Sequence, residues 1–151
     1  MISSADPPKK NVSVLVVEDD ADDYDFLEDA LKCCGNNSDI QWVKDGDQAV
    51  DYLFRKGEYQ DETRYPEPDL VFLDIRIPKK NGLEVAKVIK ADPKLRTLPT
   101  FMLTSSSSST DVMHAYENGA NSYFKKPEGL EEIAQFKKAI CLFWSSVVLY
   151  P

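Results

Sequence analysis

The chain has 151 residues, of which 42% are hydrophobic and 29% are charged, as expected for a single globular domain. Its formal net charge of -8 argues against nucleic acid and anionic membranes as partners, because both bind clusters of lysine and arginine. No apolar run approaches the roughly 20 residues that cross a bilayer, and the N-terminal residues lack the apolar segment typical of a signal peptide. The three cysteines are odd in number, and Cys33 and Cys34 are adjacent, which indicates neither a disulfide framework nor a zinc site. We therefore expect a reduced, cytoplasmic protein.

Strand-like and helix-like segments alternate along the chain. Short apolar runs predict five strands, at residues 12–17, 40–43, 70–74, 100–104 and 122–124. Helices are predicted after each strand, and four of them have apolar faces: Tyr24, Leu27, Leu31 and Cys34; Ala49, Val50, Leu53 and Phe54; Leu83, Ala86 and Ile89; and Leu130, Ile133, Phe136, Ile140 and Phe143. This alternation indicates an α/β fold with a parallel sheet over residues 12–143, after a flexible arm (1–11) and before an apolar C-terminal extension (144–151).

Two connections are expected to be irregular. Residues 55–68 form a polar loop that is longer than most connections in compact domains. Residues 105–109 are five serines, which is typical of a flexible loop. Because they directly follow a predicted strand, they are also a candidate for a mobile loop beside a site.

Polar side chains stand at the ends of four predicted strands. Glu18 and Asp19 follow the first, Asp74 closes the third, Thr104 closes the fourth and Lys126 follows the fifth. The carboxyl ends of the strands in an open parallel sheet line one ligand crevice, so these side chains are expected to meet. Each residue alone has an ordinary explanation as a helix cap, a strand residue or a surface charge. Their joint placement favours a site, whereas the nearby acids Asp22, Asp23, Asp25, Glu28 and Asp29 are expected to form a solvated helix face.

This set of residues suits phosphoryl chemistry that depends on magnesium. Mg2+ prefers hard oxygen ligands, and Glu18, Asp19, Asp74 and the backbone carbonyl of Arg76 could supply them, with Mn2+ as a substitute. A carboxylate can attack phosphorus to form an aspartyl-phosphate. Lys126 would then neutralise charge, and a hydroxyl at the end of the fourth strand could donate a hydrogen bond to a phosphoryl oxygen.

The pattern resembles the receiver domain of two-component response regulators over roughly residues 12–143. The resemblance rests on six features, which are the acid pair Glu18-Asp19, Asp74, the loop after it with Pro78 and Gly82, Thr104, Tyr123 and the Lys126-Pro127 pair. It implies a flavodoxin-like fold of five parallel strands in the order 2-1-3-4-5. It also implies a signalling protein that is not an enzyme, in which Asp74 takes a phosphoryl group from a sensor histidine kinase. Thr104 would move toward that group, Tyr123 would turn inward, and Lys126 would contact the group from the other side.

A narrower resemblance links the chain to single-domain regulators that are paired with bacterial phytochromes. It rests on the loop before residue 68, the PKKNG turn at 78–82 and the ending FWSSV at 143–147. It implies a light-sensing histidine kinase as partner and a regulator that often dimerises. The expected contact surface combines the fourth helix, fifth strand and fifth helix, with the candidates Tyr116, Phe136, Trp144 and Val147. The extension 144–151 either belongs to this surface or folds back to complete the core.

Three other functions are open to this sequence. A phosphatase with an aspartyl-phosphate intermediate needs an acid two residues after the nucleophile, and Arg76 stands there instead. That bulky cation could attract phosphodonors or pair with an acid. A docking module without phosphorylation would not need Lys126 together with the acid pair. A histidine phosphocarrier would have to use His114, which is expected to be an ordinary surface residue in a short helix.

Overall fold

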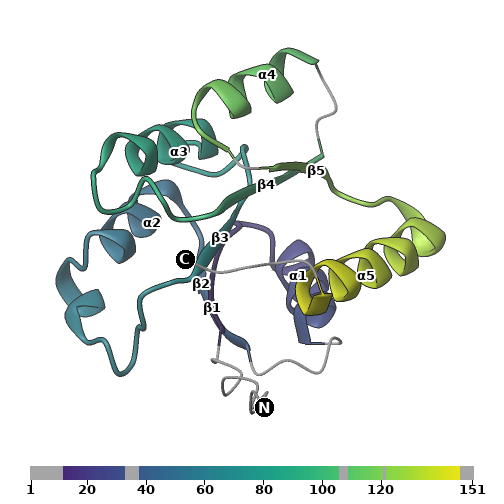
Figure 1. The fold of residues 1–151 in the computed structure, drawn as a ribbon, viewed down its shortest axis with the longest axis horizontal. Coiled ribbons are helices and arrows are strands. Elements are labelled where there is room, and N and C mark those ends of the chain that lie inside the picture. The colour runs from purple at the N-terminus through teal and green to yellow at the C-terminus, as the bar shows by residue number, and fades with distance from the viewer. Residues whose placement is uncertain (1–11, 33–37, 106–108, 121, 147–151) are drawn as a thin grey trace, which may run out of the picture.

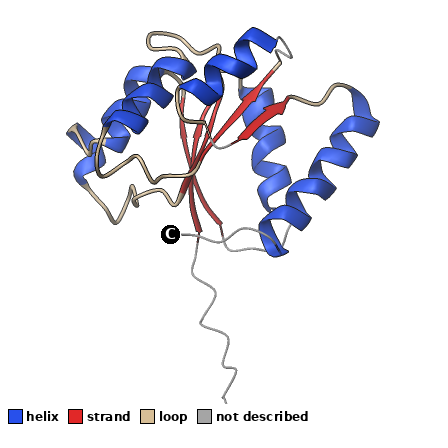
Figure 2. Ribbon diagram, turned by 45° about the horizontal axis from the view of Figure 1, so that its top comes forward, coloured by secondary structure: helices blue, strands red, loops and turns tan. Residues whose placement is uncertain are grey.

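The computed structural model describes residues 12–32, 38–105, 109–120 and 122–146. They form one five-stranded parallel sheet with helices on both faces (Figures 1 and 2). The strand order is β2-β1-β3-β4-β5, which confirms the predicted flavodoxin-like fold. The elements in chain order are β1 (Val12–Val17), α1 (Ala21–Lys32), β2 (Ser38–Val43), α2 (Gly46–Leu53), the 3-10 helix η1 (Gly57–Gln60), β3 (Leu70–Leu73), α3 (Gly82–Ala91), β4 (Thr100–Thr104), α4 (Ser109–Glu117), β5 (Ser122–Lys125) and α5 (Gly129–Ser146).

Two hydrophobic cores hold the layers together. The helices α2, α3 and α4 cover one face of the sheet, and α1 and α5 cover the other (Figure 1). The strands β1, β3 and β4 have buried residues on both faces, which is why they read as continuous apolar runs in the sequence. Within the described residues, no helix combines the length and the hydropathy that a membrane crossing requires.

The ends of several elements differ from the prediction. β2 begins at Ser38, two residues early, because it pairs with β1 along its whole length. α5 continues through Ser146, three residues past the predicted face. Leu130 was predicted on the apolar face of this helix but is 87% exposed, since the first turn of α5 lies away from the sheet (Figure 1). The predictions on Cys34 and on the middle of the serine run lie outside the described residues.

The predicted irregular loop 55–68 is folded against the domain. It contains η1, and the rings of Tyr59 and Tyr65 pack on Tyr52, with ring centroids 5.0–6.0 Å apart. The Tyr52 hydroxyl donates to the carbonyl of Pro66 at 2.6 Å, and Arg55 donates to the carbonyl of Tyr65. Aromatic packing and backbone contacts therefore order this segment, although its composition is polar.

The register of the parallel strands brings the predicted site residues to one edge of the sheet. Val17 of β1 is paired with Leu73 of β3, so the next residues, Glu18 and Asp74, are neighbours. The Asp74 N–H donates to the carbonyl of Val17 at 3.0 Å. On the other side, the Lys126 N–H donates to the carbonyl of Thr104 at 2.7 Å. Residues from β1, β3 and the segment after β5 therefore converge.

Gly82 allows α3 to start directly beside this edge. Its N–H donates to the carbonyl of Ile75 at 2.8 Å. A Cβ at this position would lie 2.1 Å from the carbonyl oxygen of Asp74 and 2.7 Å from Cα of Ile75. Both atoms are backbone, so no rotamer change could relieve the contact.

The substitution Gly82→Ala is therefore expected to lower the free energy of unfolding by about 3 kcal/mol, the upper range for overpacking. Gly57→Ala is the control, because a Cβ there meets no atom within 4 Å although φ is +59°. That control should lose only about 1–2 kcal/mol from backbone strain. Urea unfolding followed by circular dichroism measures both, and equal losses would contradict the proposed close contact.

Candidate functional site

Three carboxylates meet where β1 and β3 end. Glu18 and Asp74 are buried, with 4% and 6% exposure, whereas Asp19 is exposed. One oxygen from each lies within 4.8 Å of the others, so the three acids form a cluster. The Glu18 N–H donates to the carbonyl of Val43 at 3.1 Å, which fixes the first acid to β2. The strand ends thus hold two buried acids and one exposed acid in reach of a single ion.

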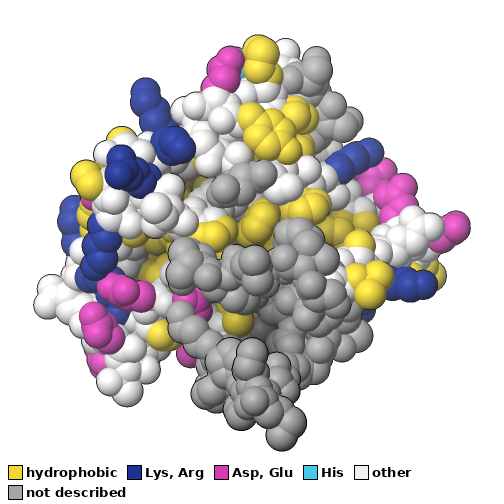
Figure 3. All heavy atoms as spheres, in the orientation of Figure 1, with side chains coloured by type: hydrophobic (Ala, Val, Ile, Leu, Met, Phe, Trp, Pro, Cys, Tyr) yellow, Lys and Arg dark blue, Asp and Glu magenta, His cyan; other side chains and the backbone are white. Residues whose placement is uncertain are grey.

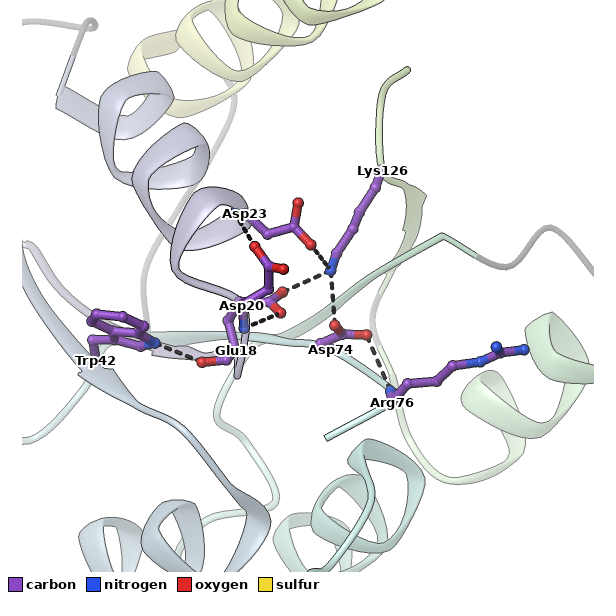
Figure 4. A network of polar contacts seen from close by, with 7 residues as sticks. All are labelled: Glu18, Asp20, Asp23, Trp42, Asp74, Arg76 and Lys126. Atoms are coloured by element: carbon purple, nitrogen blue, oxygen red, sulfur yellow. Dashed lines mark hydrogen bonds and ion pairs between the residues drawn. The ribbon is translucent and has the colours of Figure 1, made fainter. Parts of the chain in front are cut away.

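Lys126 supplies the positive charge for this cluster. Its Nζ lies 2.8 Å from Glu18 Oε2 and 2.8 Å from Asp74 Oδ2 (Figure 4). The other oxygen of Asp74, Oδ1, accepts the backbone N–H of Arg76 at 3.1 Å. Both oxygens of Asp74 therefore have a fixed partner, and the side chain has one defined orientation.

Asp23, an acid outside this cluster, also contacts Lys126, although the sequence predicted it on a solvated helix face. Its Oδ2 lies 2.7 Å from Nζ of the lysine, so it is not part of a purely solvated helix face. The reason is the start of α1: Asp20 Oδ1 accepts the N–H of Asp23 at 2.9 Å and caps the helix. This cap places the first turn of α1 over the strand ends (Figure 4). No local pattern in the sequence indicates this contact, because it joins residues 103 positions apart.

Burial and the neighbouring charges set the pKa values of Glu18 and Lys126. Burial raises the pKa of the Glu18 carboxyl from 4.5 to about 7; the Lys126 hydrogen bond opposes this rise, and the nearby Asp74 carboxylate adds to it. Burial alone would lower the pKa of Lys126, but its hydrogen bonds to Asp23, Asp74 and Glu18 outweigh burial and raise it. The lysine is therefore a permanent cation, whereas Glu18 is costly to ionise until more positive charge arrives.

Comparison with known proteins agrees with this geometry. The model of the response regulator receiver domain matches residues 14–137. The chain belongs to the response regulator receiver family. It is 33% identical to the response regulator Rcp1 of Synechocystis sp. over 151 residues, which cover 100% of this chain and 99% of that protein.

Solved structures of phytochrome response regulators share this receiver fold. The phosphorylated cyanobacterial phytochrome response regulator RcpA has a TM-score of 0.85 and 34% identity, covering 94% of this chain and 99% of that one. The Mn2+-bound form of Rcp1 has a TM-score of 0.84 and 33% identity, covering 93% and 99%. The resemblance to receivers, and to those of phytochromes in particular, is thus confirmed.

The acid cluster of this receiver fits a small divalent cation. The three carboxylates offer only hard oxygen donors, which Mg2+ prefers. Octahedral Mg2+ with bonds of about 2.1 Å spans about 4.2 Å between opposite ligands. This span is close to the 4.8 Å within which the three carboxylate oxygens lie. The burial of Glu18 and Asp74 beside one lysine leaves more negative than positive charge. A divalent cation would remove that excess.

The other predicted residues of the receiver differ in exposure. Thr104 is fully buried at the end of β4, and Tyr123 of β5 is half-buried against the core under α2, α3 and α4. The side chain of Arg76 is exposed and points away from the acids, so it does not pair with them (Figure 4). His114 is an exposed residue of α4, as expected.

Trp42 supports the site in a way that the sequence did not indicate. Its Nε1 donates to the carbonyl of Glu18 at 2.6 Å (Figure 4). Its ring stacks on Tyr24 of α1, with centroids 4.1 Å apart and an angle of 3°. The indole thus joins β2, the Glu18 backbone and the first turns of α1.

The predicted contact residues are only partly described. Tyr116 is 49% exposed on α4, beside Met113 at 53%, and hydrophobic side chains are visible over α4 in Figure 3. Phe136 is half-buried on α5 and packs against Phe26, with ring centroids 5.1 Å apart. The side chain of Trp144 and all of Val147 lie outside the described part of the chain. This contact surface stays a prediction.

The raised pKa of Glu18 gives a testable pH dependence. The folded protein binds a proton at Glu18 between pH 4.5 and about 7, where the unfolded chain has lost it. The stability from this proton is therefore complete below pH 4.5 and is lost as pH rises to about 7. Glu18→Gln cannot ionise, so in metal-free buffer its free energy of unfolding should rise relative to that of the native chain across this range. A constant difference in urea unfolding experiments would show that Glu18 ionises normally.

Proposed function

We propose that this receiver is a single-domain response regulator that accepts a phosphoryl group on Asp74 with Mg2+. The observation that carries the proposal is the placement of Asp74. Asp74 is a buried carboxylate, and one of its oxygens is paired with the Lys126 ammonium. Glu18 and Asp19 lie close enough to bind the same ion as Asp74. A phosphoryl acceptor needs this combination of a fixed nucleophile and concentrated positive charge.

The reaction follows from the contacts of Asp74. One of its oxygens forms a bond to phosphorus, and the bond from phosphorus to the leaving group breaks, with the electron pair departing on that group. Lys126, which donates to Asp74 Oδ2 before the reaction, then donates an N–H to a phosphoryl oxygen. The Arg76 N–H donates to Asp74 Oδ1 and fixes the orientation of the carboxylate. Glu18, Asp19, Asp74 and the Arg76 carbonyl would hold Mg2+ or Mn2+, which neutralises charge as the phosphoryl group approaches. The modification is a signal, and the chain turns over no other substrate.

The output is a change of shape followed by contact with another protein. A phosphoryl group at Asp74 adds a charge near minus two, which attracts the Thr104 hydroxyl and Lys126. Movement of Thr104 leaves space for Tyr123 to turn inward and alters the surface of α4, β5 and α5. Tyr116, Phe136, Trp144 and Val147 are the contact candidates on that surface, and a homodimer is one assembly that it would support.

The partner that fits best is a sensor histidine kinase of the phytochrome type in the cytoplasm. Support comes from the likeness to Rcp1 and to RcpA, which is described as a cyanobacterial phytochrome response regulator. A receiver that serves as a docking module without phosphorylation is the second candidate, and the experiment below separates the two.

Incubation of the full chain with magnesium and acetyl phosphate is expected to add one phosphoryl group, measured by intact mass. The Asp74→Asn variant should gain none, because an amide does not attack phosphorus. Replacing magnesium by a chelator should abolish the gain in the native chain, since the excess negative charge of the acid cluster then repels the donor. A native chain that stays folded and unmodified with magnesium would favour the docking module.

A further inference from the structure

Lys126 is held by two acids of the cluster and by one acid outside it. An ammonium has three N–H donors, and three carboxylates surround this one. Its Nζ lies 2.8 Å from Glu18 Oε2, 2.7 Å from Asp23 Oδ2 and 2.8 Å from Asp74 Oδ2. Glu18 and Asp74 share the acid cluster with Asp19, whereas Asp23 comes from the first turn of α1.

The three contacts differ in what a divalent cation would do to them. Glu18 and Asp74 have side chains that are only 6% exposed, and their oxygens would be shared between the cation and the lysine. The cation would also repel the ammonium at this short range. Asp23 is 43% exposed and does not belong to the cluster, so its attraction for Lys126 has no such competitor. Its share in holding the lysine therefore grows when the cluster binds a cation.

The backbone of α1 fixes Asp23 in this position before any ligand arrives. Asp20 caps the helix through the N–H of Asp23, and the carbonyl of Asp20 accepts the N–H of Tyr24 at 3.0 Å. Tyr24 in turn is stacked on Trp42, whose indole donates to the Glu18 carbonyl. The first turn of α1 and the end of β1 thus form one connected unit, and the Asp23 carboxylate faces the lysine from it (Figure 4).

We propose that Asp23 is a positioning residue for phosphoryl transfer, which keeps the Lys126 ammonium beside Asp74 while the acid cluster holds a divalent cation. This inference rests on the proposed role of Asp74 as phosphoryl acceptor. As an Asp74 oxygen bonds to phosphorus and the leaving group departs with its electron pair, the Lys126 N–H that faced Asp74 turns to a phosphoryl oxygen. The Lys126 N–H that donates to Asp23 keeps this acceptor throughout, and no proton is transferred.

Asp23→Ala tests the proposal against the matched control Asp22→Ala. Asp22 is an exposed acid in the same helical turn and is not among the three acceptors of Lys126. Both variants lose one charge at the helix N-terminus, so their effects on helix stability and net charge are alike. At saturating magnesium with acetyl phosphate, Asp23→Ala should slow phosphorylation of Asp74 about five- to tenfold. The control should change the rate less than about twofold.

A double-mutant cycle shows whether Asp23 acts through the lysine. In a Lys126→Gln background, Asp23→Ala should slow the reaction less than about twofold, because the group that it positions is absent. An effect of the same size in both backgrounds would overturn the proposal, and so would equal effects of Asp23→Ala and Asp22→Ala.

A second readout does not depend on phosphorylation. The proton–nitrogen signal of the Lys126 ammonium in nuclear magnetic resonance reports how fast its protons exchange with water. With magnesium bound, this signal should persist in the native chain and in Asp22→Ala but broaden in Asp23→Ala. Persistence in Asp23→Ala would overturn the proposal. If the native chain shows the expected signal but never gains a phosphoryl group, the proposed function fails while the role of Asp23 in holding Lys126 stands.

Discussion

The attraction between one ammonium and three carboxylates is the interaction on which the rest of this receiver depends. Glu18 and Asp74 are buried acids, and burying a carboxylate is costly unless a charge or hydrogen bond compensates it. Lys126 provides that compensation with three contacts of 2.7–2.8 Å. One positive charge does not balance three carboxylates, and burial, together with the nearby Asp74 carboxylate, raises the pKa of Glu18. The site is therefore stable enough to fold and still attracts more positive charge.

The fold supports this cluster from every side. Parallel pairing puts the ends of β1 and β3 next to each other, and the absence of a side chain at Gly82 lets α3 start against the Asp74 carbonyl. The Trp42 indole binds the carbonyl of Glu18, and Asp20 caps the helix that carries the third acid. These contacts are made by backbone groups or by stiff side chains, so the positions of the charged groups are set before a ligand arrives. Preorganisation of this kind suits a reaction that consists mainly of charge neutralisation.

Much of this could be predicted from the sequence, because apolar runs that end in polar residues reveal both the strands and the edge where they meet. The contact of Asp23 with Lys126 could not be predicted, since helical periodicity indicates a solvated face but not that a lysine 103 residues away reaches it. Leu130 was assigned to the core for the same reason: spacing does not reveal where a helix leaves the sheet. The folded loop 55–68 depends on the packing of Tyr59 and Tyr65 against each other and of Tyr65 against Tyr52, which the polar composition of the loop does not indicate.

The most direct test of this account is the free energy of unfolding of Lys126→Met, measured at about pH 8 with and without magnesium, because Glu18 is then mostly ionised in the native chain. Without magnesium the variant should lose about 3 kcal/mol, the lower end of the range for removing one partner of a buried ion pair, since the buried carboxylates lose their counter-charge. Magnesium should stabilise the variant more than the native chain, because a cation in the acid cluster replaces the missing charge. A variant as stable as the native chain, or an equal effect of magnesium on both, would contradict the account.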